Sequence, residues 1–301
     1  MPSFRSAGVS ESTWILPSLS ALLASPEADG WRLWLGRAER LPQSEFGARQ
    51  AFADALGNEI ATLPWARASA SVDLQPEQAE RVVAIADPLQ TRVEVFDLRL
   101  IGVGLGALAS TAVAELIAGI NQWIADDGLE LVVGRQHWYL CGDAGTWSDP
   151  GCAPPDSLLG ASLADALPKA PRWQRLLNET QMFLNQNPGM QQLRADGATA
   201  IDSLWFWGGA SVWPSQSRVA SIEASEPGFM AIASALKLDG GNNPNAPGLV
   251  EGPSTRADAV PSALAQGRLR LYCASGERFA LRPRDRYRFW SAPYTEDTHE
   301  R

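Results

Sequence analysis

The sequence predicts an α/β protein with a mixed sheet and helices on its faces, either one large globule or two closely packed α/β subdomains. Two observations support this fold class. Short apolar stretches with strand character alternate along the chain with amphipathic stretches of helical period, which is the order typical of layered α/β folds. Hydrophobic residues make up 45% and charged residues 20% of the 301 residues, which is ordinary for a globular protein with a substantial core.

In the first half of the chain, strands flank the clearest helix. The expected elements are a helix over 44–57, strands over 81–88 and 93–102, a helix over 107–127, and strands over 129–133 and 137–141. Gly57 should end the first helix, and Asp87 and Pro88 should end the first strand. The order strand, strand, helix, strand, strand favours a layered sheet over a helical bundle.

The second half repeats this alternation after a loop that is rich in Gly, Pro, Asp and Ser. The expected elements are a helix over 171–188, strands over 200–209 and 218–225, a helix over 227–239, and a hairpin over 268–274 and 278–283. The loop is a candidate seam, which divides the chain into an N-terminal portion over 1–141, a C-terminal portion over 156–291 and a polar tail over 292–301. Residues 239–253 predict a long surface loop.

Charge and composition narrow the classes of partner. The net charge is -9, which repels a phosphate backbone over most of the surface, so nucleic acid is not an expected partner. No apolar run reaches the roughly 18 residues that a membrane helix needs, so no membrane partner is expected. Residues 14–24 are read as a folded segment, with a signal-peptide core as the alternative. Three irregularly spaced cysteines are typical of reduced thiols in a cytoplasmic protein.

The segment DSLWFWGGASVWPS, residues 202–215, is the strongest candidate for a binding site. Alternation puts Trp205 and Trp207 on one face, and the other face is apolar too, so the strand should be covered on both sides. Gly208 and Gly209 then allow a sharp turn where the strand ends, which is the usual position of a ligand crevice in open α/β sheets, and turn N–H groups can hold an anion. The alternative is a buried strand whose tryptophans belong to the core.

The helix expected over 171–188 carries a row of carboxamides. Asn178, Gln181 and Asn185 share one face, and Glu179 is the acid beside them. Carboxamides can bind a polyhydroxylated or phosphorylated ligand without adding charge, but the same row suits a solvated face.

Chemistry-bearing motifs are sparse. The chain has two histidines, His137 and His299, so a histidine-rich metal centre cannot be built and no metal site is expected. We expect His137 to be a hydrogen-bonded structural residue rather than half of a catalytic pair. No P-loop, nucleophile-elbow or zinc-protease motif occurs, and residues 102–107 fail the dinucleotide frame, so no cofactor is expected.

Four segments together resemble a known family. They are RVVAIADP, INQWIADDGLELV with RQHWYL, WQRLLNETQMFLNQNP and IDSLWFWGGASVWP, and in this order they are similar to the bacterial RpfE-type regulatory proteins over residues 80–235. That family is often labelled cofactor-independent phosphoglycerate mutase, through a distant likeness to part of the alkaline phosphatase superfamily. The resemblance implies a shared fold fragment. The mutases use a two-metal centre of aspartates and histidines with a phosphorylated serine, and this chain lacks their D-x-G-D motif.

The chain departs from the family pattern at two positions of the Trp/Gly segment. Asp202 stands where asparagine is usual, and Ala210 stands where a third glycine is usual. At an anion-binding turn, Asp202 would oppose the anion by charge and Ala210 would restrict the backbone.

Three hypotheses about function follow. The first is a degenerate, non-enzymatic phosphomutase-like protein that binds a small phosphorylated metabolite or a protein partner in a regulatory role. Its crevice would be lined by Trp205, Trp207, Gly208, Gly209, Asn178, Glu179 and Gln181. The second is an active phosphomutase or phosphatase whose magnesium is held by Asp87, Glu179 and Asp202. The third makes the aromatic segment pure core and puts function on an interaction surface such as residues 239–253.

Overall fold

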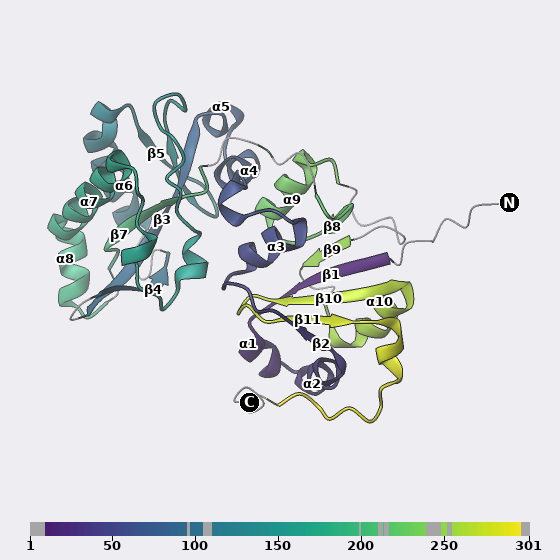
Figure 1. Cartoon of the computed structure of the whole chain (residues 1–301). Coiled ribbons are helices and arrows are strands. Elements are labelled where there is room, and N and C mark those ends of the chain that lie inside the picture. Colours follow the sequence, from purple (N-terminus) through teal and green to yellow (C-terminus); the bar gives the residue numbers. More distant parts are fainter. Residues whose placement is uncertain are drawn as a thin grey trace. The chain divides into compact units, whose positions relative to one another are not determined.

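The chain has the mixed α/β structure that the sequence predicts, and it divides into two compact units (Figure 1). The computed structural model describes residues 10–94, 97–104, 110–198, 200–209, 213, 217–238, 248–251 and 255–295. The first unit consists of residues 1–58 and 215–301, and the second consists of residues 59–214. The second unit is therefore an insertion between the two chain segments that build the first.

A six-stranded sheet organises the first unit. Its order is β2 (Glu39–Leu41), β11 (Arg278–Leu281), β10 (Gly267–Cys273), β1 (Ser10–Leu16), β9 (Gly248–Glu251) and β8 (Ser221–Glu223). The strands β10, β1, β9 and β8 are parallel, and β11 and β2 extend the sheet antiparallel. The predicted C-terminal hairpin is confirmed as β10 and β11. The segment 14–24 folds as the end of β1 followed by a helix.

Helices cover both faces of this sheet. They are α1 (Leu19–Leu23), α2 (Ala28–Arg37), α3 (Ala48–Leu56), α9 (Pro227–Ala235) and α10 (Val260–Gln266). Figure 1 shows α1 and α2 on the face opposite α3 and α9. Alternation along β1 explains why both faces are apolar, because Trp14 and Leu16 pack into the cluster with α1 and α2 while Ile15 is also buried. On the other face, the rings of Phe52 and Phe229 stack with centroids 4.2 Å apart.

The second unit contains a five-stranded antiparallel sheet. Its path is β4 (Asp97–Val103), β3 (Val82–Glu94), β6 (Trp138–Cys141) and β5 (Glu130–Val133), and β7 (Ser203–Trp207) also pairs with β3. Its helices are α4 (Trp65–Asp73), α5 (Pro76–Ala79), α6 (Ser110–Ile124), α7 (Pro171–Gln186) and α8 (Pro188–Ala195). Short 3₁₀ helices are also present. In the second unit they cover residues 60–62, 125–127, 155–158 and 164–166, and in the first unit they cover residues 257–259 and 283–287.

The predicted end of the first strand at Asp87 and Pro88 is wrong, because β3 continues to Glu94. Ile85 pairs with both β6 and β7, and Leu89 pairs with both β4 and β7. Strand β7 therefore follows one edge of β3, while β6 and then β4 follow the other edge. Residues 86–88 fall between β6 and β4, where no strand requires the N–H that Pro88 lacks. The strand expected over 93–102 is likewise the end of β3 plus β4, and residues 95–96 lie outside the described part.

The four long helices predicted from the sequence are confirmed, and part of one predicted loop is a strand. The helices predicted over 44–57, 107–127, 171–188 and 227–239 appear as α3, α6, α7 and α9. Within the loop predicted over 239–253, residues 248–251 form β9, because β1 and β8 pair with it on its two sides. The remainder of that loop, 239–247 and 252–253, lies outside the described residues, as do Ala210 and His299.

The candidate seam over 142–155 lies inside the second unit. Trp147 packs edge-on against Trp173 of α7, with ring centroids 4.9 Å apart. The carbonyl of Ala153 accepts a hydrogen bond from the Trp205 indole N–H over 2.9 Å. Contacts of this kind tie the loop to elements on both sides of it.

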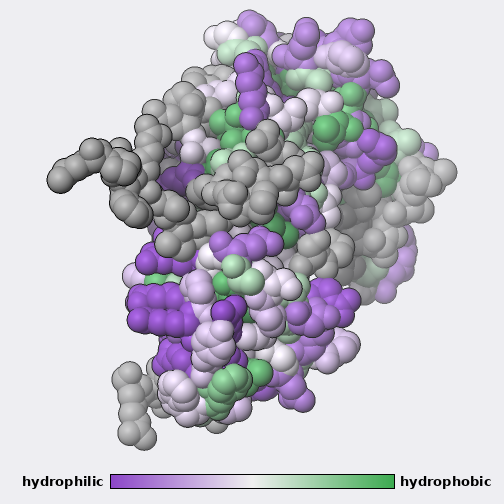
Figure 2. Space-filling model, turned by 90° about the vertical axis from the view of Figure 1, so that its right-hand side faces the viewer, coloured by the Kyte–Doolittle hydropathy of each residue, from purple (hydrophilic) through white to green (hydrophobic). Residues whose placement is uncertain are grey.

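Figure 2 shows hydrophilic and hydrophobic residues interspersed over one face of the chain. No helix within the described residues is long and apolar enough to cross a membrane.

Candidate functional site

Strand β7 is buried along its whole length, as its two apolar faces predict. Phe206 faces α7, where its ring lies 5.4 Å from the ring of Trp173. Trp205 and Trp207 point the other way and are 1% and 0% exposed. These two indoles therefore pack as core side chains, and each places its N–H against an acceptor inside the second unit.

The Trp207 indole belongs to a buried polar network centred on Asp87. Its Nε1–H donates to Asp87 Oδ2 over 2.8 Å, and Asp87 Oδ1 lies 2.8 Å from His137 Nδ1. Asp87 is 5% exposed, and the His137 ring meets the Trp207 ring edge-on with centroids 6.0 Å apart. The expectation that His137 is a hydrogen-bonded residue is confirmed. Its partner is Asp87, which lies in β3 between the residues that pair with β6 and those that pair with β4.

A second buried carboxylate lies at the end of α4. Asp73 accepts hydrogen bonds from the backbone N–H of Arg135 over 2.8 Å and of Gln136 over 3.1 Å, and from the Tyr139 hydroxyl over 3.1 Å. Burial acts to raise the pKa of Asp73, but these hydrogen bonds outweigh it and hold the pKa below its ordinary value. Asp73 thus fixes the β5–β6 turn that carries His137.

The glycine turn after β7 is tightly packed. Gly208 has φ +73°, and a Cβ there would lie 2.9 Å from the Cβ of Trp65. Its carbonyl accepts the N–H of Ala66 over 2.9 Å, at the beginning of α4. A Cβ at Gly209 would lie 2.5 Å from the carbonyl oxygen of Val83. Only glycines fit both positions, so the turn is fixed by its neighbours.

The turn holds an internal anion. The backbone N–H of Gly209 donates to the carboxylate of Asp149, and the N–H of Gly151 donates to Asp149 Oδ1 over 3.0 Å. Burial raises the pKa of Asp149 above its ordinary value, although both hydrogen bonds act to lower it. The carboxylate of Asp149 is therefore the acidic side chain that lies at the glycine turn.

The carboxamide row lies near the other end of β7. Gln181 Nε2 reaches the hydroxyl of Ser203, the first residue of the strand, over 3.3 Å. Asn178 is exposed and Glu179 is half-buried. Five residues of extended chain, or roughly 16 Å, separate Ser203 from Gly208. The structure thus brings Gln181 to the strand but puts it at the end remote from the glycines.

The carboxylates proposed as magnesium ligands have protein partners. Both oxygens of Asp87 are engaged as described above. Asp202 Oδ1 pairs with Arg194 over 3.0 Å, and Oδ2 accepts the N–H of Thr91 over 2.8 Å. Within the described residues, no group of three or more His, Cys, Asp or Glu side chains is arranged to hold a metal ion. Asp87, Glu179 and Asp202 do not converge into a ligand set.

Sequence reasoning missed a polar cluster in the first unit. Arg278 is 4% exposed, and it pairs with Asp54 Oδ2 over 3.0 Å and donates to the carbonyl of Cys273 over 2.7 Å. Asp54 also accepts hydrogen bonds from Ser44 and Gln50. Nothing local in the sequence indicates this pairing, because Asp54 and Arg278 come from the two separate chain segments of the unit.

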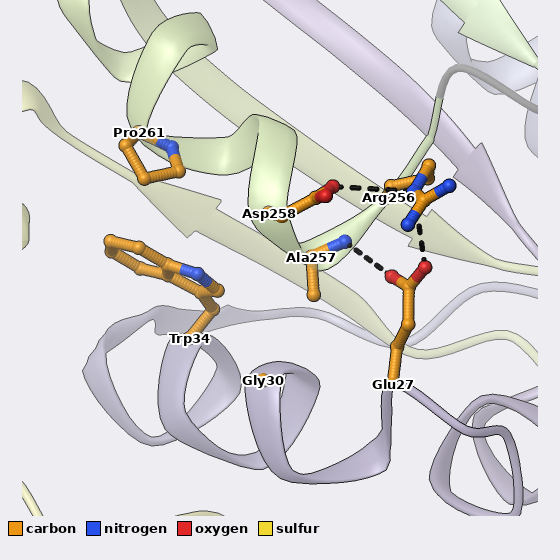
Figure 3. Close-up of a pocket in the computed structure, with 7 residues that line it drawn as sticks. All are labelled: Glu27, Gly30, Trp34, Arg256, Ala257, Asp258 and Pro261. Carbon is orange, nitrogen blue, oxygen red and sulfur yellow. Dashed lines mark hydrogen bonds and ion pairs between the residues drawn. The ribbon is translucent and has the colours of Figure 1, made fainter.

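A cavity of about 330 Å³ opens between α2 and the start of α10 (Figure 3). Trp34 and Pro261 form its apolar end, and Gly30 forms part of its floor. At the opposite end, Arg256 Nε lies 3.1 Å from Glu27 and 3.3 Å from an aspartate on the rim. The volume is at the lower end of the range for small-molecule sites.

Comparisons with known proteins give a partial match. No family model matches the chain. A probable 2,3-bisphosphoglycerate-independent phosphoglycerate mutase of Geobacter sulfurreducens is 27% identical over 110 residues, which are 34% of this chain and 27% of the mutase. The match thus spans about a quarter of the length of that relative.

Two solved structures also align along most of the chain. A cofactor-independent phosphoglycerate mutase from Thermoplasma acidophilum has 14% identity and a TM-score of 0.37 over 91% of this chain and 90% of its own. A protein from Pyrococcus horikoshii has 12% identity and a TM-score of 0.41 over 90% of this chain and 86% of its own. The sequence match shows similarity to a phosphoglycerate-mutase-like protein over about a third of this chain.

Proposed function

We propose that this protein is a phosphoglycerate-mutase-like binding protein of the RpfE type, which holds a small phosphorylated metabolite in a regulatory role without metal-dependent catalysis. The 110-residue similarity to a probable phosphoglycerate mutase supports the ligand class. The family resemblance of the Trp/Gly segment supports the regulatory role. The contacts of the glycine turn support a position for such a ligand at Gly209.

The position of the Asp149 carboxylate at the glycine turn carries the proposal, because its Oδ1 accepts the Gly151 N–H over 3.0 Å and the Gly209 N–H acts to lower its pKa. A backbone donor that accepts a carboxylate presents the same geometry to a phosphate oxygen, because both are anionic acceptors. Burial raises the pKa of Asp149, which means that the fold destabilises the ionised form of this carboxylate. In this proposal a bound phosphate replaces the carboxylate of Asp149, which is only partly buried.

Asp202 does not oppose an anion at this turn. Its charge is neutralised by Arg194 over 3.0 Å, and it precedes the first residue of β7 while the glycines follow the last. The objection that the sequence raises against a phosphate site at Gly208 and Gly209 therefore loses its basis. A carboxylate that opposes the ligand is present, but it is Asp149.

The hydrogen bonds of Asp87 and Asp202 favour binding over metal-dependent catalysis. Three of the four oxygens accept from side chains, Trp207, His137 and Arg194, and the fourth accepts a backbone N–H. A metal ion would have to displace these donors from buried or half-buried positions. A phosphate at the Gly209 turn needs no such rearrangement of β3.

The test is thermal melting with 3-phosphoglycerate, 2-phosphoglycerate and inorganic phosphate, each with and without Mg²⁺ and Mn²⁺. A ligand at 100 times its Kd stabilises by about 2.7 kcal/mol, which raises the Tm by roughly 2 °C in a chain of this size. We expect a metal-independent shift with a phosphoglycerate. The D149N variant should bind more tightly, because the competing negative charge is gone.

Asp143 provides the matched control. It makes the same turn as Asp149, accepting the N–H of Gly145 over 2.9 Å, but it does not contact Gly209. D143N should leave the ligand response unchanged. A shift that requires metal, together with mutase or phosphatase turnover, would establish the competing enzyme hypothesis. No shift with any phosphorylated compound would overturn the ligand class.

A further inference from the structure

The segment that follows β11 exposes more aromatic surface than its position in a folded unit explains. Tyr287, Phe289 and Trp290 are 55%, 74% and 79% exposed. Arginines alternate with them at positions 284, 286 and 288. Contiguous exposed aromatic side chains of this size are typical of interaction sites, whereas isolated ones are ordinary.

This segment is held firmly against the first unit. Asp285 is 6% exposed and caps the 3₁₀ helix 283–287 by accepting the N–H of Arg282 over 2.8 Å. Arg37 of α2 donates to the carbonyl of Arg286 over 3.2 Å, and Arg288 donates back to the carbonyl of Arg37 over 2.9 Å. The aromatic side chains are therefore exposed on an ordered backbone, which lowers the conformational-entropy cost of binding a partner.

The chain remains attached beyond the aromatic residues. Tyr294 is 4% exposed, and its backbone N–H donates to the carbonyl of Arg32 over 2.8 Å. Figure 1 shows this last part of the chain, in yellow, passing from α10 to α2. Residues 287–290 are thus anchored on both sides.

Arginines that have no carboxylate partner among the described residues lie beside residues 287–290. Arg37 is 5% exposed, and its guanidinium lies 4.9 Å from the Trp34 ring and 5.3 Å from the Phe289 ring. Its Nε atom is buried and has no hydrogen-bond partner. In the described part of the chain, neither Arg37 nor Arg284 nor Arg286 has a carboxylate within ion-pair distance. A buried cation that only aromatic faces and a carbonyl compensate favours the approach of an anion.

We propose that Arg284, Arg286, Tyr287, Phe289 and Trp290, with Arg37 behind Phe289, form a docking surface for an acidic segment of a partner protein. We call it the arginine–aromatic surface. Tryptophan, tyrosine and arginine are the residue types that contribute most binding free energy at protein interfaces. The cations complement acidic side chains, and the rings provide apolar anchors between them. This inference is independent of the ligand site at Gly209.

Two other occupants fit less well. In a twofold contact between copies of this chain, the arginine–aromatic surface would face itself and bring like charges together. Single-stranded nucleic acid stacks its bases on free ring faces. Here Arg286 covers Tyr287 at 4.6 Å and Arg37 covers Phe289 at 5.3 Å, so these two rings do not offer free faces to bases.

The test uses the full chain and three fluorescein-labelled probes, read by anisotropy. The probes are a peptide of repeated Glu-Glu-Leu triplets, a peptide of repeated Lys-Lys-Leu triplets, and a single-stranded oligothymidylate. We expect the acidic peptide to bind with a Kd of about 10 µM at low salt and more weakly as salt rises. The basic peptide should not bind.

Variants distinguish this surface from the rest of the molecule. R284E and the double variant F289S/W290S should each weaken binding of the acidic peptide by about tenfold or more. These side chains are exposed, so the variants should fold, which melting curves verify. R268E is the matched charge control, because Arg268 is an exposed arginine elsewhere in the first unit, and it should change binding by less than about twofold.

Three outcomes overturn the proposal. The first is no binding of the acidic peptide at about 100 µM. The second is tighter binding of the oligothymidylate than of the peptide, which would indicate nucleic acid. The third is an equal loss of binding in R268E and R284E, which would indicate attraction by the whole chain rather than by this surface.

Discussion

The indole N–H of Trp207 donates to the carboxylate of Asp87 over 2.8 Å in the interior of the second unit. Through the other oxygen, Asp87 also joins His137, which precedes β6. The most conspicuous aromatic segment of the sequence and the only histidine in the described residues therefore belong to one buried network. The network joins three parts of the sheet, because Asp87 lies in β3, Trp207 lies in β7 and His137 precedes β6.

The W207F variant should lower the free energy of unfolding by about 1 to 3 kcal/mol. Phenylalanine fills most of the indole volume but leaves Asp87 Oδ2 buried without its donor. Equilibrium urea unfolding, followed by circular dichroism, measures the change. W290F is the matched control, because Trp290 is 79% exposed and should change stability by less than about 0.5 kcal/mol. Equal stabilities of W207F and wild type would mean that the hydrogen bond contributes nothing.

Period and turn chemistry were enough to predict β7, α7 and the C-terminal hairpin from the sequence. The apolar alternation of 203–207 and the stripe on 171–188 are local patterns that the core requires. The polar network could not be predicted in this way. Asp87 lies 50 residues from His137 and 120 from Trp207, and no local pattern reports a pairing over that distance.

Two other elements, α4 and β9, could not be predicted because their local sequence patterns are weak. The buried face of α4 consists of Trp65 followed by alanines and a serine, so its periodicity is weak in hydrophobic terms. Strand β9 has one fully buried side chain, Leu249, and exists because neighbours pair with it on both sides. The candidate ligand site at Gly208 and Gly209 stays a prediction, and the Asp149 side chain that lies at this turn comes from the loop over 142–155, which the sequence offers only as a candidate seam.

Asp73 should contribute stability that is lost in acid. Its pKa in the folded chain lies below its ordinary value, so the unfolded chain binds the proton more readily. The contribution is fully present above the ordinary carboxyl pKa and disappears as pH falls through the folded value. D73N should lower the free energy of unfolding by about 1 to 3 kcal/mol near pH 7, because an amide nitrogen replaces one accepting oxygen and then faces either the Arg135 N–H or both Gln136 and Tyr139. The difference from wild type should shrink in acid, and urea unfolding at several pH values would reveal a constant difference if this is incorrect.

Asp149 should show the opposite dependence on pH. Its folded pKa is raised by burial, so the folded chain binds the proton more readily and the ionised carboxylate destabilises the fold at neutral pH. The unfavourable contribution of Asp149 to stability should therefore disappear as pH falls from neutral through its folded pKa. D149N keeps an oxygen acceptor without the charge, and it should be more stable than wild type near pH 7 but not near pH 4.

D143N is the control of opposite sign for that experiment. Hydrogen bonds from the Gly145 N–H and the Thr146 hydroxyl lower the pKa of Asp143, so its neutral variant should gain no stability at neutral pH. Urea midpoints of both variants at neutral and acid pH provide the comparison. If D149N were the less stable protein at neutral pH, the charge of Asp149 would be compensated by the fold, and the reason to expect its replacement by a phosphate would be lost.

G208A should destabilise the second unit more than another glycine replacement of equal backbone strain. Gly208 has φ +73°, and its Cβ would lie 2.9 Å from the Cβ of Trp65, so the variant combines left-handed strain with a clash against α4. Gly151 has φ +68° and nothing within 4 Å of the added carbon, so G151A reports the strain alone. Strain of this kind costs about 1 to 2 kcal/mol. Urea unfolding should therefore show the larger loss in G208A, by about 1 to 3 kcal/mol, which is the range for overpacking. Equal losses would mean that α4 moves aside freely, and the turn would then not be fixed by its neighbours.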